Sequence, residues 1–296
     1  MDEEVLAWLL DGDPAVRWRV MRDFTSATDD EVAGERERVA TEGWGARLLA
    51  EQRPDGGWGE GDYSPKWTST TYTMLHLLWL GLPAGHDAVL RGCERLWAWQ
   101  RTWRAPETCV AGIVVRLTSV FRYGAERLDG LVEHLVGEQL DDGGWNCKSR
   151  GDKGMHGSFH TSIQALEALD AYREGGGTVE VGPAVGRGRE FFLRHRLYQS
   201  HRTGAVAIPA STKFPSFPEW HFDVLRGLEY FAQNGQPRDD RLADAVEIVK
   251  GARRRDGRWS TYSGYPGKQF FRLEEPGASR MNTARALHVL RWWEAS

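Results

Sequence analysis

Apolar residues recur at helical spacing along most of the chain. Because a helix brings residues three and four apart onto one face, apolar positions repeated at that interval predict a helix with one buried side. The spacing predicts helices over residues 36–53, 66–82, 87–101, 107–122, 127–140, 157–173, 183–196, 217–233, 239–253 and 279–295. Taken in order, these stretches pair into five helical hairpins.

A shorter pair of helices is predicted near the start of the chain, over residues 3–10 and 14–23. The second of these begins at Asp13-Pro14, where aspartate is a favoured N-cap residue and proline suits the first helical turn. The pair provides a sixth hairpin. We expect the segment 1–30 to complete a closed ring of hairpins.

Successive helices alternate in character. Stripes of charge mark the stretches 36–53, 127–140 and 239–253, whereas apolar or hydroxylic residues dominate 66–82, 107–122 and 157–173. Charged stretches suit an outer layer that faces water, and apolar stretches suit an inner layer. The pattern predicts an all-α protein, an α/α toroid with inner and outer helices, formed as one domain over residues 1–296.

A short motif recurs at the ends of predicted outer helices. Segments 52–58 and 139–145 both read Q-x-x-x-G-G-W, and segment 253–259 keeps the Asp, Gly and Trp but begins with arginine. Glycine after a helix can adopt the left-handed conformation that ends it, and a buried indole can fix the turn to its neighbour. We expect the three tryptophans to serve the scaffold rather than catalysis.

Composition excludes some classes of function. The 296 residues carry a formal net charge of -4, which gives no basic surface for nucleic acid. No apolar run approaches the roughly 18 residues of a membrane-spanning helix, and the acidic start lacks a signal peptide's basic and apolar regions. Three cysteines are too few for a disulfide framework and fit a reducing compartment. We therefore expect a cytoplasmic protein with no membrane span.

The repeated motif resembles the QW motif of squalene and oxidosqualene cyclases and the related repeats of protein prenyltransferase β-subunits. The likeness covers most of the chain. It implies the α/α toroid fold of that superfamily, and a central cavity that takes an isoprenoid or a similar apolar small molecule. A shared scaffold does not fix the chemistry, which depends on the site residues.

Class II cyclases of this superfamily begin catalysis with a D-x-D-D motif, whose middle acid protonates an alkene. The sequence has no D-x-D-D. Its acidic pairs lie elsewhere, since Asp141-Asp142 belongs to the turn motif and Asp239-Asp240 opens a predicted outer helix. A cyclase reaction would require a different acid.

The prenyltransferase β-subunits hold zinc through a D-x-C motif and the histidine of a Y-H-T motif, which open successive inner helices. The chain has Glu107-Thr108-Cys109 and Phe159-His160-Thr161 at the corresponding places. The resemblance implies that Cys109, His160 and Glu107 bind zinc, with Cys147 as a further candidate ligand. A thiolate, an imidazole and a carboxylate can fill three corners of a tetrahedral site and leave one open for catalysis. Alternatively, Cys109 and His160 are ordinary core residues.

Several other residues near the openings of inner helices are candidate site residues. His156 and His221 are candidate acids or bases, and the rings of Trp67 and Trp220 could stabilise a cation. Lys66 and Arg280 are candidates for contact with a diphosphate or carboxylate group, which helix N-termini also favour.

Four functions remain open on this basis. The first is a zinc-dependent enzyme, a prenyltransferase-like transferase or a cyclase, acting on an isoprenoid or similar apolar molecule. The second is a metal-free terpenoid cyclase, and the third is a non-catalytic binding protein on the same scaffold. The fourth is a carbohydrate-active ring, which needs two carboxylates drawn from Glu107, Glu219 and Asp223. No oligomeric state follows from the pattern.

Overall fold

The protein is all-α, as the hydrophobic pattern predicts. The computed structural model describes residues 2–103, 106–124, 127–147, 156–262 and 265–295. The helices are α1 (Glu3–Leu10), α2 (Pro14–Phe24), α3 (Asp29–Glu37), α4 (Gly43–Ala50), α5 (Thr70–Leu80), α6 (Asp87–Gln100), α7 (Thr108–Val120), α8 (Asp129–Gly137), α9 (Phe159–Glu174), α10 (Gly182–Arg194), α11 (Val224–Gln233), α12 (Ala243–Gly251) and α13 (Arg280–Ala295). Two short antiparallel strands, β1 (Trp259–Ser260) and β2 (Ala278–Ser279), pair beside α13. Short 3-10 turns span Arg38–Ala40, Pro209–Thr212 and Asp240–Leu242.

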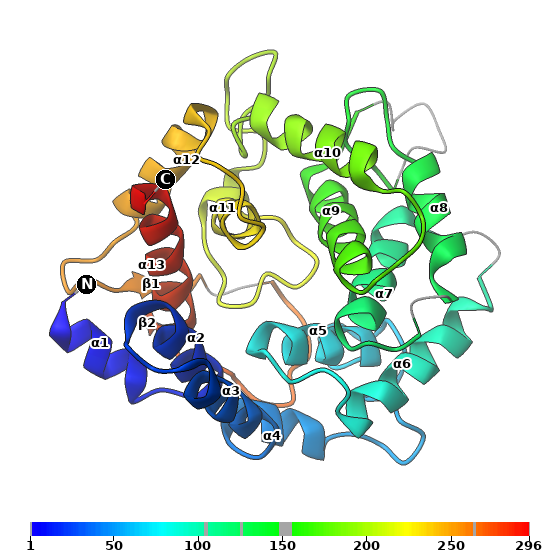
Figure 1. Ribbon diagram of the computed structural model, residues 1–296, viewed down its shortest axis with the longest axis horizontal. Helices are drawn as coiled ribbons and strands as arrows, with labels where there is room; N and C mark the ends of the chain where they lie inside the picture. Colours follow the sequence, from blue (N-terminus) through cyan, green and yellow to red (C-terminus); the bar gives the residue numbers. More distant parts are fainter. Residues whose placement is uncertain (1, 104–105, 125–126, 148–155, 263–264, 296) are drawn as a thin grey trace.

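The helices follow one another around the centre of the molecule (Figure 1). In this view α6, α8 and α10 lie at the periphery, with α5, α7 and α9 on their inner side. The helices α7 and α9 pack along each other, and at their closest approach a Cβ on Gly112 would lie 3.1 Å from the backbone of Gln164. The buried apolar side chains form a continuous cluster across the helices.

The first copy of the repeated motif fixes the end of α4. Trp58 is fully buried, and its indole nitrogen donates to the carbonyl of Leu48 at 2.7 Å. The amide nitrogen of Gln52 donates to two carbonyls, Gly56 within the turn and Ala88 in the first turn of α6. The motif therefore joins an outer helix to the next outer helix.

The other two copies repeat this geometry. The indole nitrogens of Trp145 and Trp259 donate to the carbonyls of Leu135 and Val249, at 2.6 and 2.7 Å. Arg253, which replaces the glutamine in the third copy, still donates to the carbonyl of the turn glycine, at 3.2 Å. Because all three indoles make the same bond to the preceding outer helix, their expected scaffold role is confirmed.

Each motif also contacts the inner helix that follows it. The amide N–H of each motif tryptophan donates to a hydroxyl in the first turns of α5, α9 and α13, from Thr70, Ser162 and Thr283, at 3.1, 2.8 and 3.0 Å. These hydroxyls fix the start of each inner helix, and so the position of the side chains in its first turns.

The predicted helix over 36–53 was wrong, because two helices occupy this region. The first, α3, begins earlier, at a capping box in which Thr28 and Glu31 each satisfy the other's backbone. The chain then turns before α4 begins at Gly43, which has a φ of +61°. A β-branched or bulky residue would be strained in that conformation.

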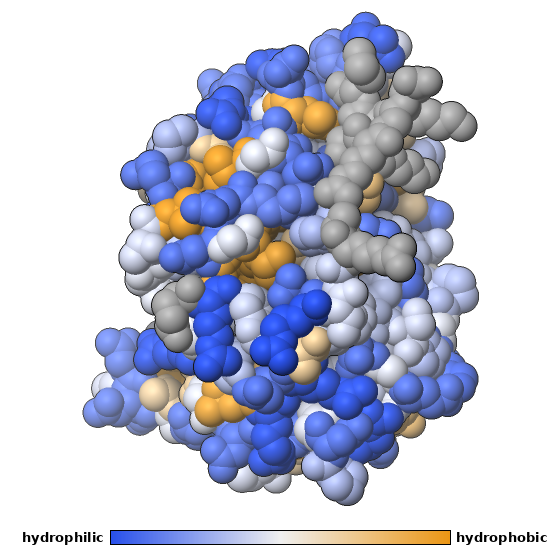
Figure 2. All heavy atoms as spheres, turned by 90° about the vertical axis from the view of Figure 1, so that its right-hand side faces the viewer, coloured by the Kyte–Doolittle hydropathy of each residue, from blue (hydrophilic) through white to orange (hydrophobic). Residues whose placement is uncertain are grey.

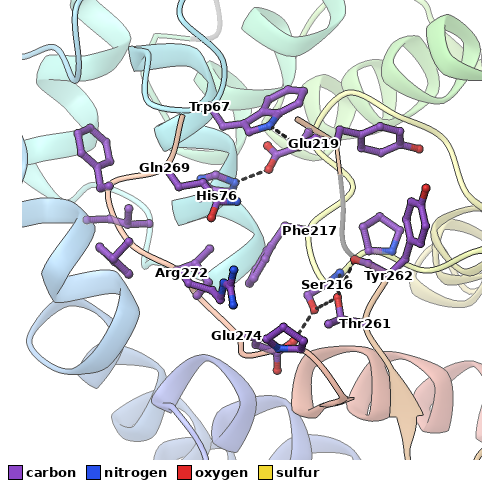
Figure 3. Close-up of a pocket in the computed structure, with 17 residues that line it drawn as sticks. Trp67, His76, Ser216, Phe217, Glu219, Thr261, Tyr262, Gln269, Arg272 and Glu274 are labelled. Carbon is purple, nitrogen blue, oxygen red and sulfur yellow. Dashed lines mark hydrogen bonds and ion pairs between the residues drawn. The ribbon is translucent and has the colours of Figure 1, made fainter. Parts of the chain in front are cut away.

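The predicted helix over 217–233 was also wrong at its start. The helix α11 begins only at Val224, where the side chain of Asp223 accepts from the amide of Arg226 as an N-cap. The residues before it form an irregular segment that passes close to α5 (Figure 3). This segment supplies part of the site described below.

The outer surface is mainly hydrophilic on the face shown in Figure 2, with apolar residues interspersed among polar ones. Among the described residues, Val206 is the exposed large hydrophobic side chain. None of the helices in the described ranges is both long and apolar enough to cross a membrane.

Candidate active site

A cavity of about 230 Å³ lies beside α5, between two irregular segments (Figure 3). One segment contributes residues 215–219, which precede α11, and the other contributes residues 261–276, which precede α13. Of the candidate site residues predicted at inner-helix openings, Trp67 is in this lining, just before α5 begins at Thr70.

A buried histidine and a buried glutamate form an ion pair or hydrogen bond in the wall of this cavity. The Nε2 atom of His76, on α5, lies 2.6 Å from Oε1 of Glu219. Both side chains are buried, and Glu219 adopts a φ of +54° that is uncommon for a residue with a Cβ. The second carboxylate oxygen, Oε2, has no hydrogen-bond partner among the described residues. The pair can therefore hold a proton and still present a free oxygen.

Aromatic rings surround the His76–Glu219 pair. Trp67 is buried, and its indole nitrogen donates to the carbonyl of Tyr265 at 3.0 Å. The ring of Phe217 lies edge-on to His76, with 5.7 Å between ring centroids. Because aromatic faces carry negative charge density, such a wall suits an apolar molecule that becomes cationic during reaction.

Three rings stack beside Trp67. The imidazole of His221 lies between Trp220 and Tyr265, with centroid separations of 3.8 and 3.1 Å. Burial is the main cause that lowers the pKa of His221 to about 3, and the nearby charges of His160 and Lys66 also lower it. His221 is therefore neutral at pH 7, which suits a base or a packing ring better than a proton donor.

Lys66 lies over this aromatic group. Its ammonium nitrogen is 5.0 Å from the ring centroid of Trp220 and 5.6 Å from that of Trp67. Among the described residues no carboxylate lies within ion-pairing distance of it. Of the two basic residues predicted to contact a substrate anion, Lys66 is the one near the cavity.

Two of the predicted metal ligands lie against each other. The thiols of Cys109, in the first turn of α7, and Cys147, after the second motif turn, interact with each other. The interaction with Cys109, together with the contact between Cys147 and the hydroxyl of Thr161 at 3.2 Å, lowers the pKa of Cys147 to about 6. The same interaction and burial raise the pKa of Cys109.

His160 makes its hydrogen bond elsewhere and not to these thiols. Its Nδ1 atom accepts from the amide of Phe222 at 2.8 Å, and burial lowers its pKa to about 4. Since an amide only donates, the proton of the neutral ring lies on Nε2, and neither nitrogen has a free lone pair for a metal. Glu107 is exposed and acts on both thiols through its charge. Within the described ranges, no three His, Cys, Asp or Glu side chains are grouped closely enough to hold a metal.

Two further predicted residues lie away from the cavity. His156 is exposed, and its carbonyl accepts from the side chain of Asn146. Arg280 contacts the N-terminal helix, where its Nε donates to the carbonyl of Trp8 at 2.9 Å. Arg280 therefore joins α13 to α1 rather than facing a ligand in this cavity.

A hydroxyl and carboxylate network closes the opposite wall. The hydroxyl of Ser216 contacts Thr261 at 2.8 Å and also donates to Glu274, which in turn accepts from Ser279. The sequence analysis missed this network, His76, and the position of Glu219 at the cavity. No local pattern marks them, because their partners come from distant segments.

Comparison with known proteins adds no family assignment. No protein-family model matches the chain, and no curated protein matches it significantly.

Proposed function

We propose that the protein is an enzyme that moves protons to and from an apolar, isoprenoid-like small molecule, in the manner of a metal-free terpenoid cyclase or isomerase. The observation that carries this proposal is the buried His76–Glu219 pair, which has one unpartnered carboxylate oxygen beside an aromatic cavity. A carboxylic acid of this kind is what the missing D-x-D-D motif would otherwise supply.

The proposed reaction needs no co-reactant. Glu219 in its protonated form transfers its proton to one carbon of an alkene, which leaves a carbocation on the neighbouring carbon and a carboxylate on Glu219. After a carbon–carbon bond forms or a hydrogen shifts, the product loses a proton to a basic group and becomes neutral. His76 exchanges the proton with Glu219 through Oε1, so it acts as a positioning and relay residue.

The aromatic wall supports this chemistry. Trp67 and Tyr265 present rings at the cavity, and a cation close to such faces is stabilised by about 0.5–2 kcal/mol per ring. Water is largely excluded from the pair, since both partners are buried, and this strengthens the electrostatic effect of each group on a charged intermediate.

Incubation with prenyl alcohols and polyene hydrocarbons in D₂O tests the proposal. We expect products isomeric with the substrate that carry deuterium at a former alkene carbon, detected by gas chromatography with mass spectrometry. Glu219→Gln should lower the rate by about 10²–10⁴-fold, because the amide cannot deliver a proton. His76→Gln should lower the rate less.

Glu60→Gln is the matched control, because Glu60 is an exposed carboxylate whose partner is Lys268. Its rate should equal that of the wild type. Product formation by Glu219→Gln at the wild-type rate, or products without deuterium, would refute the proposal.

Zinc chemistry is a second candidate, favoured by the contact between Cys109 and Cys147. Two thiols are a partial ligand set, and in this arrangement His160 does not complete it. We therefore derive no reaction step through a metal, and zinc binding stays a prediction.

Elemental mass spectrometry of the purified protein tests whether it binds zinc. About one zinc per chain, lost in both Cys109→Ala and Cys147→Ala, would support a metalloenzyme, and a metal-free, folded wild type would exclude it.

A further inference from the structure

A second, larger cavity of about 1010 Å³ lies at the other ends of the inner helices. Its lining includes the last turns of α5, α7, α9 and α11, and helices α2 and α3 form a side wall. The first cavity, by contrast, is lined mainly by the segments that lead into the first turns of α11 and α13, and by Trp67 just before α5. The two cavities are therefore at opposite ends of the inner layer.

A group of buried, paired charges lies beside this second cavity, and Arg116 and Glu229 of this group are in its lining. Arg116 and Arg226 both pair with Glu167, at 2.6 Å for the first, and Arg285 pairs with Glu229 at 2.8 Å. The buried carboxylate of Asp223 also interacts with Arg226 and Arg285, so three guanidinium groups share three carboxylates. All three arginines are buried, so water does little to screen these charges.

Arg19 adds a fourth guanidinium to this group. Its charge interacts with Glu229 and Arg285, and no carboxylate in the described ranges lies within ion-pairing distance of it. Burial lowers the pKa of Arg19 to about 10, which still leaves it charged at pH 7. One of its terminal nitrogens caps α5 by donating to the carbonyl of Trp79.

Trp79 lies at the centre of the cationic group. The guanidinium carbons of Arg116, Arg226 and Arg285 lie 4.9, 5.3 and 5.6 Å from its ring centroid. Its indole N–H is buried and has no acceptor among the described residues. An unsatisfied buried donor is unfavourable, so a native protein normally provides an acceptor for it.

Two more groups in the lining are buried and unpartnered within the described ranges. They are the Nε of Arg19, which its capping bond leaves free, and the hydroxyl of Ser119 in the last turn of α7. The C-terminal carbonyl groups of four helices bring partial negative charge to the cavity, and the positive charge of the arginine side chains opposes it. The lining therefore presents several unpartnered N–H and O–H donors beside its arginines, and the carboxylates of Asp29, Glu37, Glu174 and Glu229 also line it.

We propose that this cavity binds a phosphate-type oxyanion, either free or carried by an organic molecule. A phosphoryl group has acceptor oxygens in several directions, and these satisfy the donors of Arg19, Trp79 and Ser119. Apolar residues such as Leu78 and Val120 also line the cavity, which suits an organic body attached to the phosphate.

Isothermal titration calorimetry with inorganic phosphate and with phenyl phosphate, at constant ionic strength, tests the proposal. We expect saturable binding of one ligand per chain. Arg19→Gln should weaken it at least about tenfold, because a charged donor is lost. Trp79→Phe, which keeps an aromatic ring but removes the N–H, should weaken it several-fold. The matched control is Arg196→Gln, on an exposed arginine paired with Asp244, and it should bind as the wild type does.

Circular dichroism of each variant establishes that it is folded, and Trp79→Phe remains informative if Arg19→Gln does not fold. Tighter binding of phenyl phosphate than of phosphate would identify an organic phosphate as the ligand class, and equal binding would identify phosphate itself. Non-saturable heats in the wild type, or wild-type affinity in both cavity variants, would overturn the proposal. Neither result depends on catalytic turnover, so the test is independent of the reaction proposed for the first cavity.

Discussion

At the scale of the residue, Asp223 shows how burial changes the acidity of a side chain. The residue caps α11 and is almost fully buried, and one of its carboxylate oxygens has no partner among the described residues. Burial raises the pKa of Asp223 to about 6, although Arg285 and the amide and charge of Arg226 act in the opposite direction. The folded protein therefore holds this proton more tightly than the unfolded chain does.

Asp223→Asn is expected to change how stability depends on pH. Between about pH 4 and pH 6 the unfolded chain has released the proton and the folded protein has kept it, so ionisation favours unfolding as pH rises. The wild type should lose about 2–3 kcal/mol relative to the variant across this window. Asparagine is also a good N-cap, so the helix start is preserved.

Urea denaturation of both proteins at pH 4, 5, 6 and 7 measures this effect. The informative quantity is the difference in unfolding free energy between the two proteins at each pH. Lost contacts with the arginines would add the same amount to this difference at every pH, so only its change with pH tests the pKa of Asp223. A difference that does not change with pH would contradict the expectation.

Sequence reasoning found some site residues and missed others for identifiable reasons. It selected Trp67, Trp220 and His221 because they lie at or near the openings of predicted inner helices, and the structure places their rings together. It could not find the His76–Glu219 pair, whose members are 143 residues apart. His76 sits within an apolar helix and Glu219 within an irregular segment, so neither belongs to a local motif.

At the scale of the element, the unit of construction is a motif turn with the helices on either side. In the second unit the buried Trp145 packs against α10 at Gly188, where a Cβ would lie 2.8 Å from the indole and 2.6 Å from Leu166. In the first unit Gly92 on α6 has the same relation to Trp58, at 2.9 Å. Each unit therefore also includes a glycine on the next outer helix, which packs against the motif tryptophan. This glycine lies outside the Q-x-x-x-G-G-W motif.

Gly188→Ala should therefore destabilise the protein. The added methyl group overlaps two buried side chains that cannot both move away, which typically costs about 1–3 kcal/mol. Gly186→Ala provides a control on the same helix, because its Cβ would meet nothing within 4 Å. That change should be neutral or stabilise the helix by up to about 1 kcal/mol.

Thermal unfolding followed by circular dichroism at 222 nm compares the two alanine variants. The expected order of melting temperatures is Gly188→Ala, then wild type, then Gly186→Ala. Equal melting temperatures for both variants would mean that contact between the motif tryptophan and the outer helix does not contribute to stability.

Most elements were predictable because their apolar spacing is regular. The predicted boundaries of the helices 3–10, 87–101 and 279–295 agree with the structure within about a residue. The errors fall where turn chemistry overrides spacing, at the Thr28 capping box and at the Asp223 cap. The strands β1 and β2 have two residues each, too few for an alternating pattern to be visible.

At the scale of the whole molecule, the two ends of the inner layer differ in chemistry. The aromatic cavity with the His76–Glu219 pair is lined mainly by the segments that lead into α11 and α13, and the last turns of the inner helices line the cavity rich in arginine. The resemblance implied a central cavity, and nothing in the sequence indicated a cavity rich in arginine. Its arginines come from helices α2, α7, α11 and α13, and only the fold brings them together.

The N-terminal helix contacts the last part of the chain, as the predicted closure requires. The ring of Trp8, on α1, lies between the guanidinium groups of Arg258 and Arg280, whose carbons are 4.3 and 4.8 Å from its centroid. Arg280 also donates to the carbonyl of Trp8, which is 272 residues away in the chain. If this contact persists in solution, the side chains of Trp8 and Arg280 should be energetically coupled.

A double-mutant cycle with Trp8→Leu and Arg280→Gln measures that coupling by urea denaturation. We expect an interaction energy of about 0.5–1 kcal/mol, the usual value for an exposed cation–π contact. Trp8→Leu combined with Arg187→Gln is the control, since Arg187 lies on α10, across the molecule from α1 (Figure 1), and distant changes should be additive. Additivity in both cycles would mean that α1 does not hold the last helix in place, and that the helices form an open arc rather than a closed toroid.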